Sequence, residues 1–159
     1  MNLIRRQAVR AVLFDPQERL LLVSCQDPSD LTRGCWWTTV GGGLEVGESA
    51  EIALRREVTE EVGIRDFELG PLLWRDCVKF RFLGNDYEQE NDYYLARTTT
   101  TAIDASGAGE IEQLSNITPR WWSLPELEAT SEIIYPLGLV QWVNQLLWNG
   151  PPAEPLTLS

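Results

Sequence analysis

The sequence predicts a single layered domain in which helices pack on a β-sheet. Its 159 residues, of which 43% are hydrophobic, suit one globular domain that closes a core without staples. Short β-prone segments occur with segments whose apolar residues recur at helical spacing, and glycines and prolines separate them. Strands and helices in this mixture favour the α/β or α+β class.

A β-hairpin is predicted near the N-terminus. Ala8 to Phe14 and Arg19 to Cys25 are its two arms, and the turn is Asp15-Pro16-Gln17-Glu18. The second arm contains four consecutive apolar residues from Leu20 to Val23. This run predicts a central strand, buried on both faces.

A short strand and a helix are predicted next. The strand covers Trp36 to Val40, and we expect Gly41-Gly42-Gly43 to end it. Ser49 is a typical N-cap residue and Gly63 a typical C′ residue. These signals predict a helix from about Ala50 to Val62.

The middle of the chain predicts a second, longer hairpin. Its strands cover Leu72 to Leu83 and Tyr87 to Thr98, and Gly84-Asn85-Asp86 is the expected turn. Residues 98–116, which contain TTTT and SGAG, predict a loop. A further strand is expected from Ile117 to Ser123.

Two helical segments and a tail complete the prediction. Pro125 begins a short helix, because proline is tolerated in the first helical turn. Tyr135 to Trp148 carries apolar residues at helical spacing and predicts a helix packed on the sheet. Residues 149–159 contain three prolines and predict a strap or a loose tail.

The composition excludes several kinds of site. Lys and Arg number 13 and Asp and Glu 24, so the formal net charge is −11, and histidine is absent. A field of this sign repels phosphate backbones and anionic lipids, so neither nucleic acid nor a membrane is an expected partner. Without imidazole, Ser-His-Asp catalysis and His-ligated zinc are excluded. Acid–base or metal chemistry in this chain must therefore use carboxylates.

The cysteines and the N-terminus indicate the compartment. Cys25, Cys35 and Cys77 are odd in number and lack CxxC spacing, which predicts neither a disulfide framework nor a zinc site. The sequence has no signal-peptide pattern and no stretch of about 18 apolar residues. We therefore expect a cytoplasmic protein with free thiols.

Three glutamates gather on one side of the predicted helix 50–62. At about 100° per residue, Glu57, Glu60 and Glu61 share roughly 100° of arc and border the apolar stripe. Like charges at these spacings repel one another, which favours a cation beside them. Mg²⁺ is the simplest candidate, because it takes oxygen ligands and binds carboxylates together with substrate phosphates. A solvated acidic face is the alternative for any such trio.

The glutamates belong to a longer pattern. Gly42 is followed after five residues by Glu48, and after seven more by the run REVTEEVGI at residues 56–64. Seven fixed residue types and two aliphatic positions at set spacing would occur by chance with a probability on the order of 10⁻⁷. Position for position, this pattern resembles the signature of the Nudix hydrolases.

Neighbouring segments are similar to the same family. They are the hairpin VRAVLFDPQERLLLV, Trp37 before the glycines, and RWWSLPEL at residues 120–127. The resemblance implies an α/β fold, namely an α/β/α sandwich around a mixed β-sheet in a single domain. We therefore expect a Nudix hydrolase domain over residues 1–148 and a Pro-rich C-terminal tail over residues 149–159.

The resemblance also implies roles for the signature residues. The implied catalytic residues are Glu48, Arg56, Glu57 and Glu60, and the implied metal ligands are Glu57, Glu60, Glu61 and the carbonyl of Gly41. Glu60 is either a further ligand or the base that deprotonates water. Glu48 and Arg56 are expected to form an ion pair that locks the loop onto the helix.

Residues outside the signature complete the candidate site. Glu110 and Glu112 lie in the predicted loop 98–116 and are candidates for an additional ligand or base, with a solvated loop as the alternative. The candidates for substrate binding are Arg10, Trp37, Arg75 and Arg81. Each of the pairs Trp36-Trp37 and Trp121-Trp122 places one ring on each strand face, so one ring should be core and the other can stack on a base.

The implied activity is hydrolysis of a nucleoside diphosphate linked to another group, by attack of metal-activated water on phosphorus. Mg²⁺ is the implied cofactor, with Mn²⁺ as a substitute. The partner is a nucleotide-derived small molecule, such as a nucleoside triphosphate, an oxidised nucleotide or a nucleotide sugar, and a homodimer is compatible with the family. The alternatives are a non-catalytic nucleotide-binding or regulatory module and an acidic interaction domain. The complete set of glutamates and arginine favours catalysis.

Overall fold

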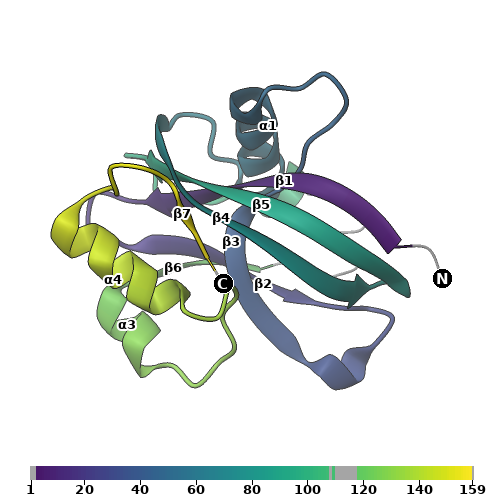
Figure 1. Ribbon diagram of the computed structural model, residues 1–159. Helices are drawn as coiled ribbons and strands as arrows, with labels where there is room; N and C mark the ends of the chain where they lie inside the picture. Colours follow the sequence, from purple (N-terminus) through teal and green to yellow (C-terminus); the bar gives the residue numbers. More distant parts are fainter. Residues whose placement is uncertain (1–2, 108, 110–117, 159) are drawn as a thin grey trace.

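Seven strands form one mixed sheet in the computed structural model, which describes residues 3–107, 109 and 118–158 (Figure 1). The strands are β1 (Leu3–Phe14), β2 (Leu20–Gln26), β3 (Cys35–Gly43), β4 (Glu68–Phe82), β5 (Asn85–Arg97), β6 (Thr118–Trp122) and β7 (Leu156–Thr157). Their order is β6-β2-β3-β1-β5-β4-β7. The pairs β1–β5 and β4–β7 are parallel and the remaining pairs are antiparallel.

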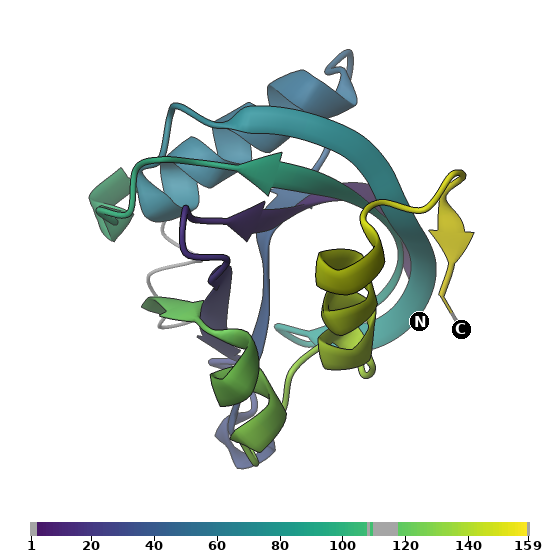
Figure 2. The same ribbon diagram turned by 90° about the vertical axis from the view of Figure 1, so that its left-hand side faces the viewer.

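Helices cover both faces of this sheet. They are α1 (Ala50–Val62), α3 (Leu124–Ala129) and α4 (Leu139–Asn149), with the 3₁₀ turns η1 (Leu31–Arg33) and η2 (Ala105–Gly107). Figure 2 shows α1 on one side of the curved sheet and α4 on the other, inside its curve. The predicted α/β/α sandwich around a mixed sheet is therefore confirmed. None of the described helices is both long and apolar enough to cross a bilayer.

Strand β1 explains why two layers of helix are needed. Val9 and Leu13 pack in a cluster with residues of α1, whereas Val12 and Phe14 pack in a second cluster with residues of α3 and α4. Successive side chains of a strand point to opposite faces, so an apolar run can only be buried if both faces are covered. We call the face toward α4 the inner face and the face toward α1 the outer face.

Helix α1 has the predicted bounds because its end signals are local. The Ser49 side chain accepts a hydrogen bond from the Ile52 N–H at 3.2 Å. Gly63 ends the helix at φ 72°, in the left-handed region. The cap at Ser49 and the left-handed residue Gly63 each act within one helical turn, so the sequence suffices to predict both ends of the helix.

The expected end of β3 at Val40 is wrong, because the strand continues through Gly43. Gly41, Gly42 and Gly43 pair with Arg10, Val9 and Ala8 of β1. The neighbouring strand supplies the hydrogen bonds that overcome the low strand propensity of glycine. The glycine segment is therefore a regular part of the sheet.

The expected start of the last helix at Tyr135 is also wrong, because α4 begins at Leu139. Trp37 of β3 donates its N–H to the Ile133 carbonyl and accepts one from Tyr135, both at 2.8 Å. These bonds hold the preceding residues in an extended conformation. The second hairpin turns at Leu83 and Gly84, both with positive φ, one residue earlier than expected.

Part of the C-terminal segment joins the sheet. β7 pairs with β4 at Trp74 and Arg75, and the Leu158 N–H donates to the Arg75 carbonyl at 2.7 Å. The Leu158 side chain is buried in the cluster of the inner face. The tail therefore acts as a strap across β4, and its boundary at residue 148 stays a prediction.

Candidate metal and phosphate site

Arg56 of α1 is the centre of the candidate site. Its Nε and Nη2 donate to the two carboxylate oxygens of Glu48, both at 2.8 Å. Nη2 also donates to the Gly43 carbonyl at 3.1 Å, and Nη1 donates to Glu57 at 2.8 Å. One guanidinium thus ties the loop, the end of β3 and the helix together, and the predicted ion pair with Glu48 is present.

Hydrogen bonding shifts the pKa values of Glu48 and Arg56 in opposite directions. The Arg56 side chain and then the Glu45 N–H, which both donate to the Glu48 carboxylate, lower the pKa of Glu48 to about 2. Hydrogen bonds to Glu48 and then Glu57 raise the pKa of Arg56, against the effect of burial. Both groups are therefore charged at neutral pH.

The Glu57 carboxylate lies against Gly42. A Cβ atom at Gly42 would lie 2.5 Å from Cδ of Glu57 and 2.6 and 2.7 Å from its oxygens. The carboxylate thus occupies the space that a side chain at residue 42 would fill. The absence of a side chain there is required for this placement of Glu57.

The Glu61 carboxylate is buried, with only 4% of the residue exposed, and it lies against Gly41. Its Oε1 accepts a hydrogen bond from the Gly41 N–H at 2.9 Å. The Gly41 carbonyl, a predicted metal ligand, is 3.4 Å from Nη1 of Arg10, which also donates to the Thr39 carbonyl at 3.0 Å. Glu61 therefore contacts the N–H of Gly41, and Arg10 contacts its carbonyl.

Glu60 differs from its neighbours because its side chain is 45% exposed, 3.6 Å from Nη1 of Arg56. Three carboxylates and a backbone carbonyl are hard oxygen donors, and this donor set fits Mg²⁺. Among residues 3–107, 109 and 118–158, no group of three acidic or thiol side chains already surrounds a common point suited to a metal ion. The fit of Mg²⁺ to these residues therefore depends on their oxygen donors and on the space beside Gly42 that the Glu57 carboxylate occupies.

The other predicted residues are distributed differently. Trp37 is buried and makes an edge-to-face contact with Trp122 at 5.1 Å, which confirms that one ring of each Trp pair is core and favours a packing role for Trp37. Arg75 pairs with Asp92 at 3.3 Å, and Arg81 lies 3.8 Å from Asp86 near the β4–β5 turn. Glu110 and Glu112 lie outside the described residues.

Sequence reasoning missed a row of polar side chains on the inner face, made by Asp76 of β4 and by Gln89, Asn91 and Tyr93 of β5. All four are buried. They form hydrogen bonds with one another and with Arg6 of β1. The spacing of two within β5 was a signal for a shared face. The partners on β1 and β4 become evident only from the strand pairing.

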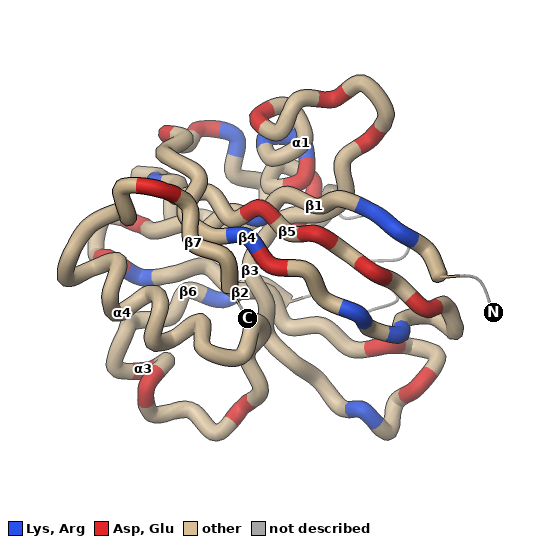
Figure 3. The backbone as a smooth tube through the Cα atoms, viewed as in Figure 1, with Lys and Arg blue, Asp and Glu red and all other residues tan. Residues whose placement is uncertain are grey.

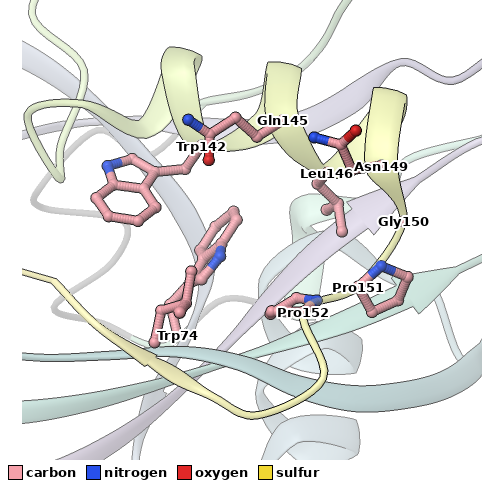
Figure 4. Close-up of a pocket in the computed structure, with 9 residues that line it drawn as sticks. Trp74, Trp142, Gln145, Leu146, Asn149, Gly150, Pro151 and Pro152 are labelled. Carbon is pink, nitrogen blue, oxygen red and sulfur yellow. The ribbon is translucent and has the colours of Figure 1, made fainter.

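A cavity of about 270 Å³ lies elsewhere, between α4, β4 and the C-terminal strap. Figure 4 shows the indole rings of Trp74 and Trp142 at one end and Pro151 and Pro152 at the other. None of the described residues that line it is charged. Its lining therefore does not suit a phosphate, and we do not include it in the candidate site.

Comparisons with known proteins concern the fold and the family of the chain. The family model described as NUDIX domain matches residues 4–142. No curated protein matches the chain significantly. Similar solved structures include a MutT protein from Methanosarcina mazei Go1, at TM-score 0.63 and 18% identity over 93% of this chain and 96% of that one.

Two further structures are similar over nearly the whole chain. The NUDIX domain of Shewanella oneidensis NrtR, complexed with ADP ribose, has TM-score 0.60 and 20% identity over 92% of this chain and 90% of that one. An ADP-ribose pyrophosphatase from Streptococcus suis 89-1591 has TM-score 0.60 and 17% identity over 96% and 98%. At these identities the likeness establishes the fold.

Proposed function

Because the chain belongs to the NUDIX domain family, and so to the hydrolases of phosphoric anhydride bonds, we propose that it cleaves a nucleoside diphosphate linked to another group. The products are a nucleoside monophosphate and the phosphorylated second group, or pyrophosphate when that group leaves as such. The observation that carries the proposal is the arrangement around Arg56, which holds Glu48, Glu57 and the glycine strand in one hydrogen-bonded unit. Glu110 and Glu112 stay candidates for an additional ligand or base.

The proposed cofactor is Mg²⁺, with Mn²⁺ as a substitute. The residues that would hold it are Glu57, Glu61 and the Gly41 carbonyl, and Glu60 is either a further ligand or the base. Bound there, the ion would polarise a substrate phosphate and lower the pKa of a bound water. Glu60, the most exposed of the three carboxylates, accepts the proton of the attacking water in this scheme.

Arg56 and the glycines act through position in the same scheme. Arg56 orients the Glu57 carboxylate and balances part of the negative charge of the glutamates. Gly42 leaves the space that this carboxylate needs. Water then attacks phosphorus and the anhydride oxygen leaves with the second phosphate, so no covalent intermediate on the protein is needed.

The proposal also covers the partners, the cellular location and the assembly of the enzyme. The substrate is a small nucleotide derivative, and the charge of −11 supports the absence of a nucleic-acid partner. Three free cysteines support a reducing, cytoplasmic location. A homodimer and a catalytic domain over residues 1–148 are also part of the proposal.

The test is a panel of nucleoside triphosphates, oxidised nucleotides, nucleotide sugars and ADP-ribose with Mg²⁺ or Mn²⁺, scored by phosphate released after phosphatase treatment. ADP-ribose belongs to the panel because two of the similar proteins are named for it or hold it. We expect metal-dependent turnover of at least one compound. Failure on the whole panel would instead favour a non-catalytic sensor of nucleotides.

The site residues are tested by Glu57→Gln and Glu61→Gln. We expect either change to lower kcat on the order of 100-fold or more, because each removes a charged metal ligand. Glu51→Gln is the matched control on the same helix, since Glu51 pairs with Arg55 at the surface, and it should keep kcat within about twofold. Circular dichroism checks the fold. A Glu57→Gln or Glu61→Gln enzyme with the parent rate would show that the site is assigned wrongly.

A further inference from the structure

The inner face of the sheet changes character along its strands. Near α4 it is apolar, with Trp74, Leu95 and Val12 in the core cluster. Toward the start of β1 it carries the polar row of Asp76, Gln89, Asn91 and Tyr93, and then Arg6. Side chains on this face recur every second residue of each strand, so the row continues the packing face of Trp74 and Leu95.

The polar row is a continuous chain of hydrogen bonds. Asp76 accepts from the Tyr93 hydroxyl at 3.0 Å and from the Asn91 amide at 2.8 Å. The Asn91 carbonyl oxygen accepts from Gln89 at 2.7 Å. The Gln89 carbonyl oxygen in turn accepts from Nε of Arg6. The amides of Gln89 and Asn91 both donate in the direction of Asp76. The carbonyl oxygen of Gln89 therefore faces Arg6.

Burial restricts the polar row to one hydrogen-bonded geometry. The four members of the row are between 2% and 8% exposed. Buried polar groups cost free energy unless each is paired, and apolar side chains of similar volume are often no less stabilising. A fully paired row does, however, hold its members in one geometry. At the Gln89 end of the row, this fixed geometry orients the Arg6 guanidinium.

Arg6 lies beside the end of the glycine strand. The Cζ atom is 3.9 Å from the position that a Cβ of Gly43 would take, and 5.3 Å from the centre of the Tyr87 ring. Gln89 holds the guanidinium through Nε, and the described part of the chain provides no hydrogen-bond partner for its two Nη groups. Two guanidinium donors without a protein partner suit a phosphate, which arginine binds in a bidentate manner.

The neighbouring arginines differ from Arg6. Nη1 of Arg10 already donates to two backbone carbonyls of β3. Arg5 points to the other face and pairs with Glu88 at 3.1 Å. Figure 3 shows this basic start of β1 beside the acidic stretch of β5. Of the three, Arg6 is the one whose fork is both oriented and accessible.

A second positive charge lies near the Arg6 guanidinium. Loss of solvent around the guanidinium and then repulsion by Arg10 lower the pKa of Arg6, while Tyr87 and Glu57 act in the opposite direction. Two like charges are thus held together near a carboxylate of the candidate metal site. A phosphate between them would relieve the repulsion.

We propose that Arg6, positioned by Gln89 and the polar row, binds a phosphate group of the substrate beside Gly43. The inference rests on the proposed function and deepens it, since it assigns the phosphate chain, and not the base or the sugar, to the inner face at the start of β1. Arg6 is the binding residue and Gln89 a positioning residue.

The test is calorimetric titration with inorganic pyrophosphate in EDTA, which separates phosphate binding from metal binding and turnover. Arg6→Ala should raise the Kd at least about tenfold, since charge-assisted hydrogen bonds are lost. Gln89→Met, which keeps the volume but removes the acceptor, should raise it about threefold. Arg5→Ala, the same residue type one position away on the opposite face, should change it less than about twofold.

A second readout separates positioning from structural support. On a hydrolysed substrate, Gln89→Met should raise KM while kcat stays within about twofold, and its unfolding curve should remain cooperative. Equal pyrophosphate affinity for the wild type and Arg6→Ala, or no binding by the wild type, would overturn the inference even if the protein hydrolyses nucleotides. Arg6-dependent binding without any turnover would instead overturn the proposed function alone.

Discussion

At each of the three consecutive glycines that end β3, the absence of a side chain has a different physical effect. Gly41 has φ +144° and its N–H donates to Glu61. Gly42 leaves space for the Glu57 carboxylate, and Gly43 accepts from Arg56 on one side and lies near Arg6 on the other. Substitutions at these neighbouring positions should therefore have different consequences.

At Gly42 we expect substitution by alanine to remove activity and leave the fold intact. The three atoms nearest to the new Cβ all belong to the end of the Glu57 side chain, which can move away, and the φ angle of residue 42 is one that alanine adopts. The free energy of unfolding should change by less than about 1 kcal/mol. Turnover should fall as in Glu57→Gln, because the carboxylate is displaced.

Gly41→Ala is the contrasting variant. Its Cβ would lie 2.1 Å from the Val9 carbonyl oxygen, on a backbone that cannot move without breaking the sheet. We expect a loss of about 3 kcal/mol or more in the free energy of unfolding. Urea denaturation and turnover of both variants check the pair. Equal stability loss in the two would contradict this account of the glycines.

At the scale of the element, Arg56 and Glu48 fasten the loop of residues 44–49 to helix α1. Arg56 donates to both carboxylate oxygens of Glu48 and also to the Gly43 carbonyl at the end of β3. The geometry is the bidentate one in which an arginine and a carboxylate interact best. The loop therefore depends on the ionised form of Glu48.

This dependence gives a pH prediction for Glu48→Gln. The folded-state pKa of Glu48, about 2, is below its ordinary value of 4.5, so the folded state favours the ionised form. The stabilisation is complete above about pH 4.5 and is lost as the pH falls toward 2. The wild type should be more stable than the variant at pH 7, and the difference should shrink by pH 3. Denaturation curves at both pH values test this, and a constant difference would contradict it.

Local signals explain which elements could be predicted. The helix over residues 50–62 has its predicted bounds because Ser49 and Gly63 act within one turn. The end of β3 was predicted wrongly because its glycines are held by β1, more than 30 residues earlier in the chain. Pairing between distant strands can reverse a local preference.

At the scale of the whole molecule, the sheet separates two apolar clusters and the C-terminal strap closes one of them. β7 adds to the edge of β4, and Leu158 inserts into the cluster that α4 covers. Leu158 is 8% exposed, whereas Leu156 of the same strap is 41% exposed. The two leucines offer a matched test of the strap.

We expect Leu158→Ala to lower the free energy of unfolding by about 2 to 3 kcal/mol, the low end for a buried leucine. Leu156→Ala should cost less than about 1 kcal/mol. Neither should alter kcat, since the site around Arg56 lies on the other side of the sheet (Figure 1). Urea titration at pH 7 measures both. Similar small losses would show that the strap contributes little to the core.

The sequence by itself determined the helix over residues 50–62 and the arrangement of its glutamates. These features follow from the 3.6-residue period and from caps within one turn, so short-range information is enough. The pairing of Glu48 with Arg56 was expected from the resemblance to the family signature. The charge of −11 and the absence of histidine also followed directly, and they restrict the site to carboxylate chemistry.

Only the tertiary structure decided which side chains face one another across the sheet. Arg6 and Gln89 are 83 positions apart, and they meet because β1 and β5 pair in parallel in one register. A shift of β1 by one residue would turn Arg6 to the outer face, away from Gln89. The register depends on which faces are buried by α1 and α4. The polar row and the orientation of Arg6 are therefore consequences of packing.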